Sequence, residues 1–292
     1  MLEYDSIAAI CEAAEQQQVT ISALVLSDQA EQTEMPEEAL YERMKNSLYV
    51  MQEAVREGKN PDLRSTSGLT GGDAAIMEAY AAGGGITGTF LNHAMARAVA
   101  VSEYNAAMGR IVASPTAGSC GILPGTVVTM LEEGRCDEHA AVMALFTAGA
   151  IGMVIAQKAS IAGAQGGCQA ECGSASAMAA AALVELAGGT PAQAAHACAM
   201  AIKNQLGLVC DPVAGLVEIP CIKRNVSGAA IAFTSAEMAL AGVKSRIPVD
   251  ECVLAMRQVG DMLPCSLKET SQAGLAATPT GLRLKRQVFG ET

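Results

Sequence analysis

Three cysteines stand in turn-forming contexts that suit metal binding. Cys168 follows two glycines, Cys210 precedes an Asp-Pro pair, and Cys221 follows a proline. Glycine and proline favour chain turns, and turns at helix ends can direct thiolates from distant parts of a chain toward one point. The long, unequal gaps between the three match neither the short zinc patterns nor the ferredoxin patterns. Spacing alone therefore leaves two interpretations open, a metal site and structural or incidental cysteines.

The other cysteines have different surroundings. Cys11, Cys198 and Cys252 lie in helical patterns and are expected in the core, because a free cysteine behaves as a small hydrophobic residue. Cys172 could form a local metal pair with Cys168, but no neighbouring residue completes a ligand set. The N-terminus shows no export signal, so the thiols are expected to be reduced. Metal binding or catalysis is then a better expectation for clustered cysteines than disulfide bonds.

Two loops rich in hydroxyl groups and glycine form a second candidate site. They are residues 65–73 and 114–121. Their hydroxyl and backbone N–H donors could hold a small carboxylate. The alternative is that the glycines only allow tight turns between packed helices.

The composition predicts an all-α protein. Hydrophobic residues make up 51 % of the 292 residues, but aromatic residues only 3 %, so alanine and aliphatic side chains dominate. Alanine is the best helix former, and few segments show the alternation of strands. We expect one large helical catalytic domain whose Gly- and Cys-rich loops line the site. The net charge of −11 and the absence of basic runs argue against a nucleic-acid partner.

Capping signals predict several helix boundaries. Pro36 and the two glutamates after it suit a helix start, and Gly58 suits its end. The segment 190–193, Thr-Pro-Ala-Gln, has the composition of a capping box. Asp250 is expected to cap a last helix, which Pro264 ends. The stretches 163–173 and 210–224 are expected to be irregular because glycine and proline interrupt them.

One uncharged stretch, residues 140–156, raises the question of a membrane helix. It is slightly short for a span, contains two glycines and has no second candidate beside it. A buried core helix is the preferred interpretation, and we expect a cytoplasmic protein without a membrane partner. Three parts are expected: a helical lead-in over 1–60, the catalytic domain over 61–285, and a tail over 286–292.

The motifs taken together resemble the bacterial iron–sulfur L-serine dehydratases, in particular the alpha chain of the two-chain type. The resemblance runs in order from about residue 60 to residue 281. The segments that carry it are residues 67–72, 103–110, 114–118, 166–171, 210–217, 220–225 and 268–270.

This resemblance implies an all-helical catalytic domain that deaminates L-serine to pyruvate and ammonia. It also implies a [4Fe–4S] cluster bound by Cys168, Cys210 and Cys221, with one iron open to act as a Lewis acid on the serine hydroxyl. Cys172 is not carried over as a ligand. The resemblance also suggests, by position, five residues that contact the substrate: Ser67, Thr70, Asn105, Ser114 and Thr116.

The general base is expected from a separate beta subunit. The family's Ser-Ser-Ser-His-Thr stretch, which carries the histidine suspected as base, is absent here. His93 stands nearest the candidate loops but is not assigned, since a structural role fits it equally well; His139 and His196 are expected to be structural. Some single-chain members end in a cysteine that can reach the fourth iron. This sequence ends in residues 289–292 without one, so that form of inhibition is not expected.

Two rival functions are weighed against this one. A pyridoxal-phosphate dehydratase could use Lys158 as Schiff-base lysine with the following glycines as a phosphate cradle. Against that interpretation, no Ser-x-Lys with an adjoining Arg-Gly occurs, and the expected helices leave little parallel sheet. The other alternative is a non-catalytic iron–sulfur scaffold subunit.

Overall fold

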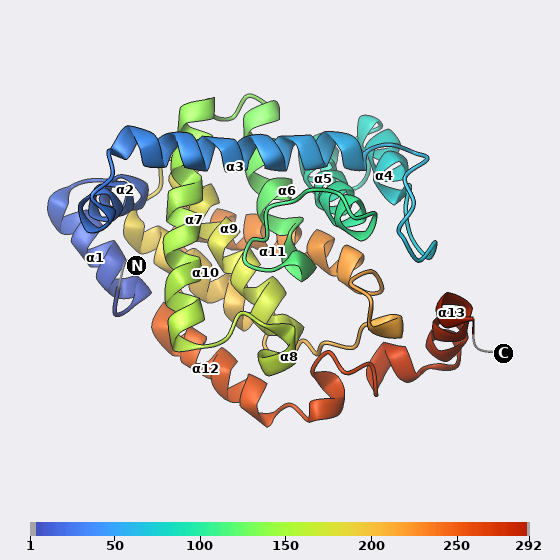
Figure 1. The fold of residues 1–292 in the computed structure, drawn as a ribbon. Coiled ribbons are helices and arrows are strands. Elements are labelled where there is room, and N and C mark those ends of the chain that lie inside the picture. Colours follow the sequence, from blue (N-terminus) through green and yellow to red (C-terminus); the bar gives the residue numbers. More distant parts are fainter. Residues whose placement is uncertain (1–3, 291–292) are drawn as a thin grey trace.

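The computed structural model describes residues 4–290, and within that range helices joined by loops form the fold (Figure 1). No β-strand forms among these residues; Cys210 and Lys268 make a single isolated bridge. This confirms the prediction of an all-α protein. The elements are α1 (Ile7–Gln17), α2 (Ile21–Thr33), α3 (Glu37–Gly58), α4 (Asp73–Ala82), α5 (Gly88–Ala106), η1 (Ala117–Ser119), α6 (Ile122–Glu132), α7 (Glu138–Lys158), α8 (Gly163–Gly166), η2 (Gln169–Gly173), α9 (Ser174–Leu186), α10 (Pro191–Lys203), η3 (Val213–Gly215), α11 (Cys221–Leu240), α12 (Val249–Met262), η4 (Cys265–Leu267), η5 (Gly274–Ala277) and α13 (Pro279–Phe289).

Helix α9 forms the centre of the core. Every residue from Ser174 to Val184 is buried, and α7, α10, α11 and α6 pack around it. Most of these residues are alanines, so neighbouring helices approach closely without large side chains between them. Close packing recurs at Gly228 of α11, where an added Cβ would lie 2.4 Å from Ile122 Cδ1. A rigid centre of this kind fixes the segment just before α9, which carries Cys168 and Cys172.

The uncharged stretch forms α7, which begins and ends where the sequence predicts. It is long and apolar enough to cross a membrane, but 67 % of its most apolar window is buried inside the structure. Its neighbours are α9, α2 and α3. The packing favours the predicted core helix.

The predicted lead-in packs on the rest of the chain. Helix α1 lies against α10, and α3 lies against α5 and α7 (Figure 1). Asp250 links the lead-in to α12, and the prediction that Asp250 caps its own helix is wrong. Pro248 is the N-cap of α12, while the Asp250 carboxylate accepts hydrogen bonds from the backbone N–H groups of Ile7 at 2.8 Å and Ala8 at 3.0 Å. Asp250 therefore satisfies the free donors at the start of α1 instead of those of its own helix.

Other boundaries are confirmed or corrected. The capping box at Thr190 and Gln193 forms as predicted. The segments 163–173 and 210–224 are more helical than expected, because α8 and the π-turn η2 fill the first and α11 already begins at Cys221. Asp250 does not lie in the last helix, since α13 follows it.

Helix α13 was not predicted. Thr278 caps it and Pro279 occupies its first turn. Only Gly281 of this helix is buried, although its sequence is amphipathic, so the helix packs little against the rest of the chain. Figure 1 shows α13 at the edge of the molecule, on the side opposite α1. Of the predicted tail, residues 286–289 continue α13, and residues 291–292 lie outside the described part.

Candidate functional site

The structure brings Cys168, Cys210 and Cys221 together; we call them the cysteine trio. Cys168 directly precedes η2, Cys210 lies between α10 and η3, and Cys221 is the first residue of α11. Each is at most 7 % exposed, and none forms a disulfide. Burial raises the pKa of Cys221 to about 12, and the negative charge of Cys168 adds to the shift. The pKa of Cys210 is raised by burial and then by the charges of Cys168 and other nearby acids. The trio members therefore lie within electrostatic reach of one another.

Residues 265–277, which we call the strap, hold the loop of Cys210. The Cys210 N–H donates to the Leu267 carbonyl at 2.9 Å, and the Glu269 N–H donates to the Cys210 carbonyl at 2.8 Å. The Leu275 N–H donates to Asp211 Oδ2 at 2.7 Å. The backbone N–H and the carbonyl of Cys210 are thus both hydrogen-bonded to the strap. These bonds fix the backbone and leave the thiol of Cys210 to bind a ligand.

Arg224 links the three segments that carry the trio. Its Nη1 donates to the Val209 carbonyl at 2.7 Å, and its Nη2 donates to Asp211 Oδ1 at 2.8 Å. The positive charge of the guanidinium also lies near Cys168 and helps to lower the pKa of that thiol. Arg224 follows Cys221 by one helical turn. It therefore ties the segments of all three cysteines to one cation.

Cys172 supports Cys168 from the interior. The two sulfur atoms are 3.4 Å apart, and Cys172 is fully buried. The contact with Cys172 and the charge of Arg224 lower the pKa of Cys168 and outweigh the opposite effect of burial. The same contact and burial raise the pKa of Cys172. Cys168 is thus the group of this pair that more easily becomes a thiolate.

The spacing of these groups excludes a site for one ion. Within residues 4–290, no group of three His, Cys, Asp or Glu side chains is close enough to hold a single metal. A mononuclear site needs every sulfur about 2.3 Å from one point. In a four-iron cluster each thiolate binds a different iron, so the sulfurs stand farther apart. Thiolates are the usual protein ligands of such clusters, and the trio supplies three thiol groups.

Asn225 fixes the loop 114–121 against the trio. Its Oδ1 accepts from the Gly121 N–H at 2.9 Å, and its Nδ2 donates to the carbonyls of Gly118 at 2.8 Å and Cys221 at 2.9 Å. The side chain is only 1 % exposed. The sequence analysis did not single out Asn225 as a site residue.

The residues suggested for substrate contact fall into separate places. Ser67 and Asn105 line a cavity of about 580 Å³ with Glu218 and with Val288 of α13. Thr70 lines a neighbouring cavity of about 500 Å³ that shares Glu218. The Thr70 hydroxyl donates to Glu218 Oε2 at 2.7 Å, so its proton is already engaged.

Ser114 and Thr116 line neither cavity. The Ser114 side chain is buried and lies 3.5 Å from the Val112 carbonyl. Thr116 Oγ1 donates to Glu171 Oε1 at 2.7 Å. Burial raises the pKa of Glu171, and the hydrogen bond from Thr116 opposes that shift. Sequence reasoning missed Glu171 and Arg224, although a charged residue inside a Gly- and Cys-rich segment is a signal that could have found them.

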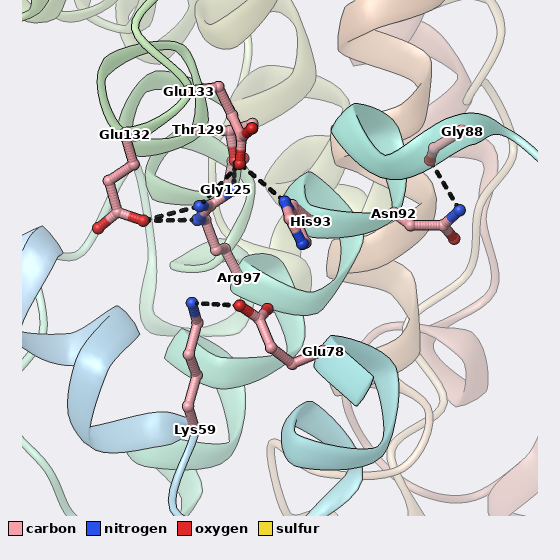
Figure 2. Close-up of polar contacts among 10 residues, drawn as sticks. All are labelled: Lys59, Glu78, Gly88, Asn92, His93, Arg97, Gly125, Thr129, Glu132 and Glu133. Atoms are coloured by element: carbon pink, nitrogen blue, oxygen red, sulfur yellow. Dashed lines mark hydrogen bonds and ion pairs between the residues drawn. The ribbon is translucent and has the colours of Figure 1, made fainter. Parts of the chain in front are cut away.

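The histidines have structural partners away from the trio. His93 Nδ1 lies 2.7 Å from Glu133 Oε1, in a network in which Arg97 also contacts Glu133 and Glu132 (Figure 2). His139 stacks on Tyr41 with ring centroids 5.2 Å apart. Burial lowers the pKa of the third, His196, and neighbouring lysines lower it further.

Lys158 is the last residue of α7, and its carbonyl oxygen lies 3.5 Å from an arginine nitrogen of α12. The glycines after it form α8 instead of an open cradle.

Comparison with known proteins gives a consistent result. A family model described as the serine dehydratase alpha chain matches residues 16–276. A probable L-serine dehydratase, alpha chain, from Bacillus subtilis (strain 168) is 50 % identical over 288 residues, which are 98 % of this chain and 96 % of that protein. The L-serine dehydratase, alpha chain, of Peptoniphilus asaccharolyticus is 45 % identical over 274 residues, 94 % of each chain. An L-serine dehydratase of Mycobacterium tuberculosis (strain CDC 1551 / Oshkosh) is 47 % identical over 184 residues, which are 61 % of this chain but 40 % of that protein.

Proposed function

This chain belongs to the serine dehydratase alpha chain family, and we propose that it is the subunit of an L-serine dehydratase that holds a [4Fe–4S] cluster on Cys168, Cys210 and Cys221. The enzyme is a lyase that converts L-serine to pyruvate and ammonia. The observation that carries the proposal is the convergence of three buried, unbridged cysteines from three segments. The family relationship favours this function over pyridoxal-phosphate chemistry at Lys158.

The residues around the trio fit such a group. Arg224 supplies a positive charge beside thiolates that would otherwise repel one another, and Asn225 and the strap fix the backbone of two ligands. When bound, the cluster supplies an open iron that acts as a Lewis acid toward the serine hydroxyl.

The overall reaction is an elimination without net redox change. The α C–H and β C–O bonds of serine break, a C=C bond forms, and the proton and hydroxide leave as water. The aminoacrylate becomes an imine, which water hydrolyses to pyruvate and ammonia. Ser67, Thr70, Asn105, Ser114 and Thr116 remain our candidates for binding the substrate in the catalytic domain, residues 61–285. Of these, Ser67 and Asn105 lie together in one cavity.

The base and the partner belong to the same proposal. The Bacillus and Peptoniphilus relatives, matched over nearly their full length, are named alpha chains, whereas the Mycobacterium relative is longer than this chain. His93, the histidine nearest the loops in sequence, is engaged by Glu133. We therefore assign the base to a separate beta subunit, and we place the complex in the cytoplasm, where free thiols stay reduced.

The test is serine turnover by the complex with the beta chain, handled without oxygen. Pyruvate formation is expected for the wild type and for Cys136→Ser, a partly exposed cysteine outside the trio. Cys221→Ser should abolish it. Full activity of Cys221→Ser would refute the proposal. A loaded wild-type complex that does not consume serine would favour the scaffold alternative.

A further inference from the structure

Glu171 places a carboxylate beside the trio that the proposed function leaves without a role. It lies in η2 and is only 8 % exposed. Its negative charge adds to the raised pKa of Cys210 and of Cys221, and at Cys168 it opposes the net lowering of the pKa. The Glu171 carboxylate is therefore within electrostatic reach of all three sulfur atoms.

The two oxygens of Glu171 have different surroundings. Oε1 accepts the hydroxyl proton of Thr116 at 2.7 Å. Oε2 packs closely against Gly163, where an added Cβ would lie 2.8 Å from Oε2 and 3.0 Å from Cys210 Sγ. An added Cβ at Gly118 would lie 2.9 Å from Oε1. Two glycines from separate segments thus allow the carboxylate to pack closely, and Oε2 and Cys210 Sγ both lie against Gly163.

Glu171 has no cation of its own. Among the described residues, no lysine, arginine or histidine forms an ion pair with it. The nearest arginine, Arg224, is committed to Asp211, to the Val209 carbonyl and to Cys168. Buried charges in proteins are normally paired, because an unpaired one loses its hydration without compensation. A cationic ligand would supply the missing partner.

We propose that the Glu171 carboxylate binds the α-ammonium group of the substrate. Thr116 holds the Glu171 carboxylate in position through its hydrogen bond. This inference rests on the proposed function. The ammonium and hydroxyl groups of serine stand on adjacent carbons, so the group that binds the ammonium has to lie close to the centre that binds the hydroxyl. Glu171 meets that requirement because Oε2 and Cys210 Sγ both lie close to Gly163. The carboxylate then selects amino acids over hydroxy acids of the same shape.

The variant Glu171→Gln removes the charge but keeps the size and an oxygen that can accept from Thr116. Glu185→Gln is a matched control, because Glu185 accepts the Thr147 hydroxyl at 2.7 Å in the same way. Glu185 is near the C-terminal end of α9, whereas Glu171 lies just before the N-terminal end of α9. The two residues are therefore about 20 Å apart along the helix axis.

The probes are L-alanine and L-lactate, which differ only in ammonium against hydroxyl. Their inhibition constants are measured against L-serine turnover by the loaded complex, and iron and sulfide are assayed in each preparation. The wild type and Glu185→Gln should prefer L-alanine. In Glu171→Gln this preference should fall by about 30-fold or more, as for a buried charge pair that loses one partner.

Each outcome decides a separate point. An unchanged preference in a fully loaded Glu171→Gln complex overturns the inference and leaves the proposed function standing, as does a wild type that binds L-lactate as tightly as L-alanine. If Glu171→Gln does not load, Glu171→Asp is measured: it keeps the charge and should keep the preference, and equal inhibition by both probes overturns the inference. A loaded wild type without serine turnover overturns both.

Discussion

Replacing Arg224 by methionine should destabilise the chain even without a cluster. Methionine keeps much of the length and apolar volume but none of the donors. The variant loses hydrogen bonds to the Val209 carbonyl and to Asp211. Asp211 is left with the Leu275 N–H as a donor while its side chain stays only 4 % exposed.

The size of the effect follows from that burial. Breaking a buried ion pair costs roughly 3–5 kcal/mol, because the remaining charge is uncompensated. Arg224 keeps 15 % of its side chain exposed, and Asp211 keeps one donor, so the low end applies. We expect a loss of about 3 kcal/mol in the free energy of unfolding, or roughly 6 °C or more in Tm.

The assay is thermal and urea unfolding of the apo chain, followed by circular dichroism. Arg257→Met is the control, because Arg257 is exposed and lies 3.5 Å from a single carbonyl; its loss should stay within about 0.5 kcal/mol. A double-mutant cycle with Asp211→Asn should show coupling of about 1 kcal/mol or more. Equal losses in the two arginine variants, or no coupling, would refute the assignment of Arg224 as the link between the trio segments.

Three further outcomes are expected. Asn225→Ala should lower the free energy of unfolding by about 2–3 kcal/mol in urea, since three buried partners lose their bonds; a loss below about 0.5 kcal/mol would contradict this. Burial raises the pKa of Glu133, but hydrogen bonds from His93 and a neighbouring arginine outweigh it, and the net shift is downward. Its stabilising contribution is therefore present above the ordinary pKa and lost as the pH falls through the lower folded value, so urea midpoints below pH 4.5 should fall less steeply in Glu133→Gln than in the wild type. Because the pKa of Cys221 is about 12, iodoacetamide at pH 8 should modify the exposed Cys265 well before it in the apo chain, and mass spectrometry showing the reverse order would refute this.

Local patterns predicted the helices well where a helix carries its own signals. Helix α7 is recognisable because its uncharged stretch has helical length, and α10 because Thr190 and Gln193 cap it locally. Asp250 has the same capping chemistry, but its partners are in α1, more than two hundred residues away in the sequence. Tertiary contacts decide which N-terminus such a carboxylate caps, and local patterns do not contain them.

The candidate site shows the same difference between features that local sequence predicts and contacts that it does not. The cysteines could be chosen from the sequence because thiols in turn contexts are distinctive. The pairing of Thr70 with Glu218 and of Thr116 with Glu171 could not be predicted, because each joins segments far apart in the chain. These bonds change the expectation for both threonines, whose hydroxyl protons are engaged by carboxylates.

The most direct test of the account is iron and acid-labile sulfide per chain after anaerobic reconstitution. We expect about four of each in the wild type. The content should fall in Cys168→Ser, Cys210→Ser and Cys221→Ser but not in Cys172→Ser, whose sulfur lies 3.4 Å from Cys168 in the interior. Wild-type protein without sulfide, or equal loading of all four variants, would contradict the cluster on the trio.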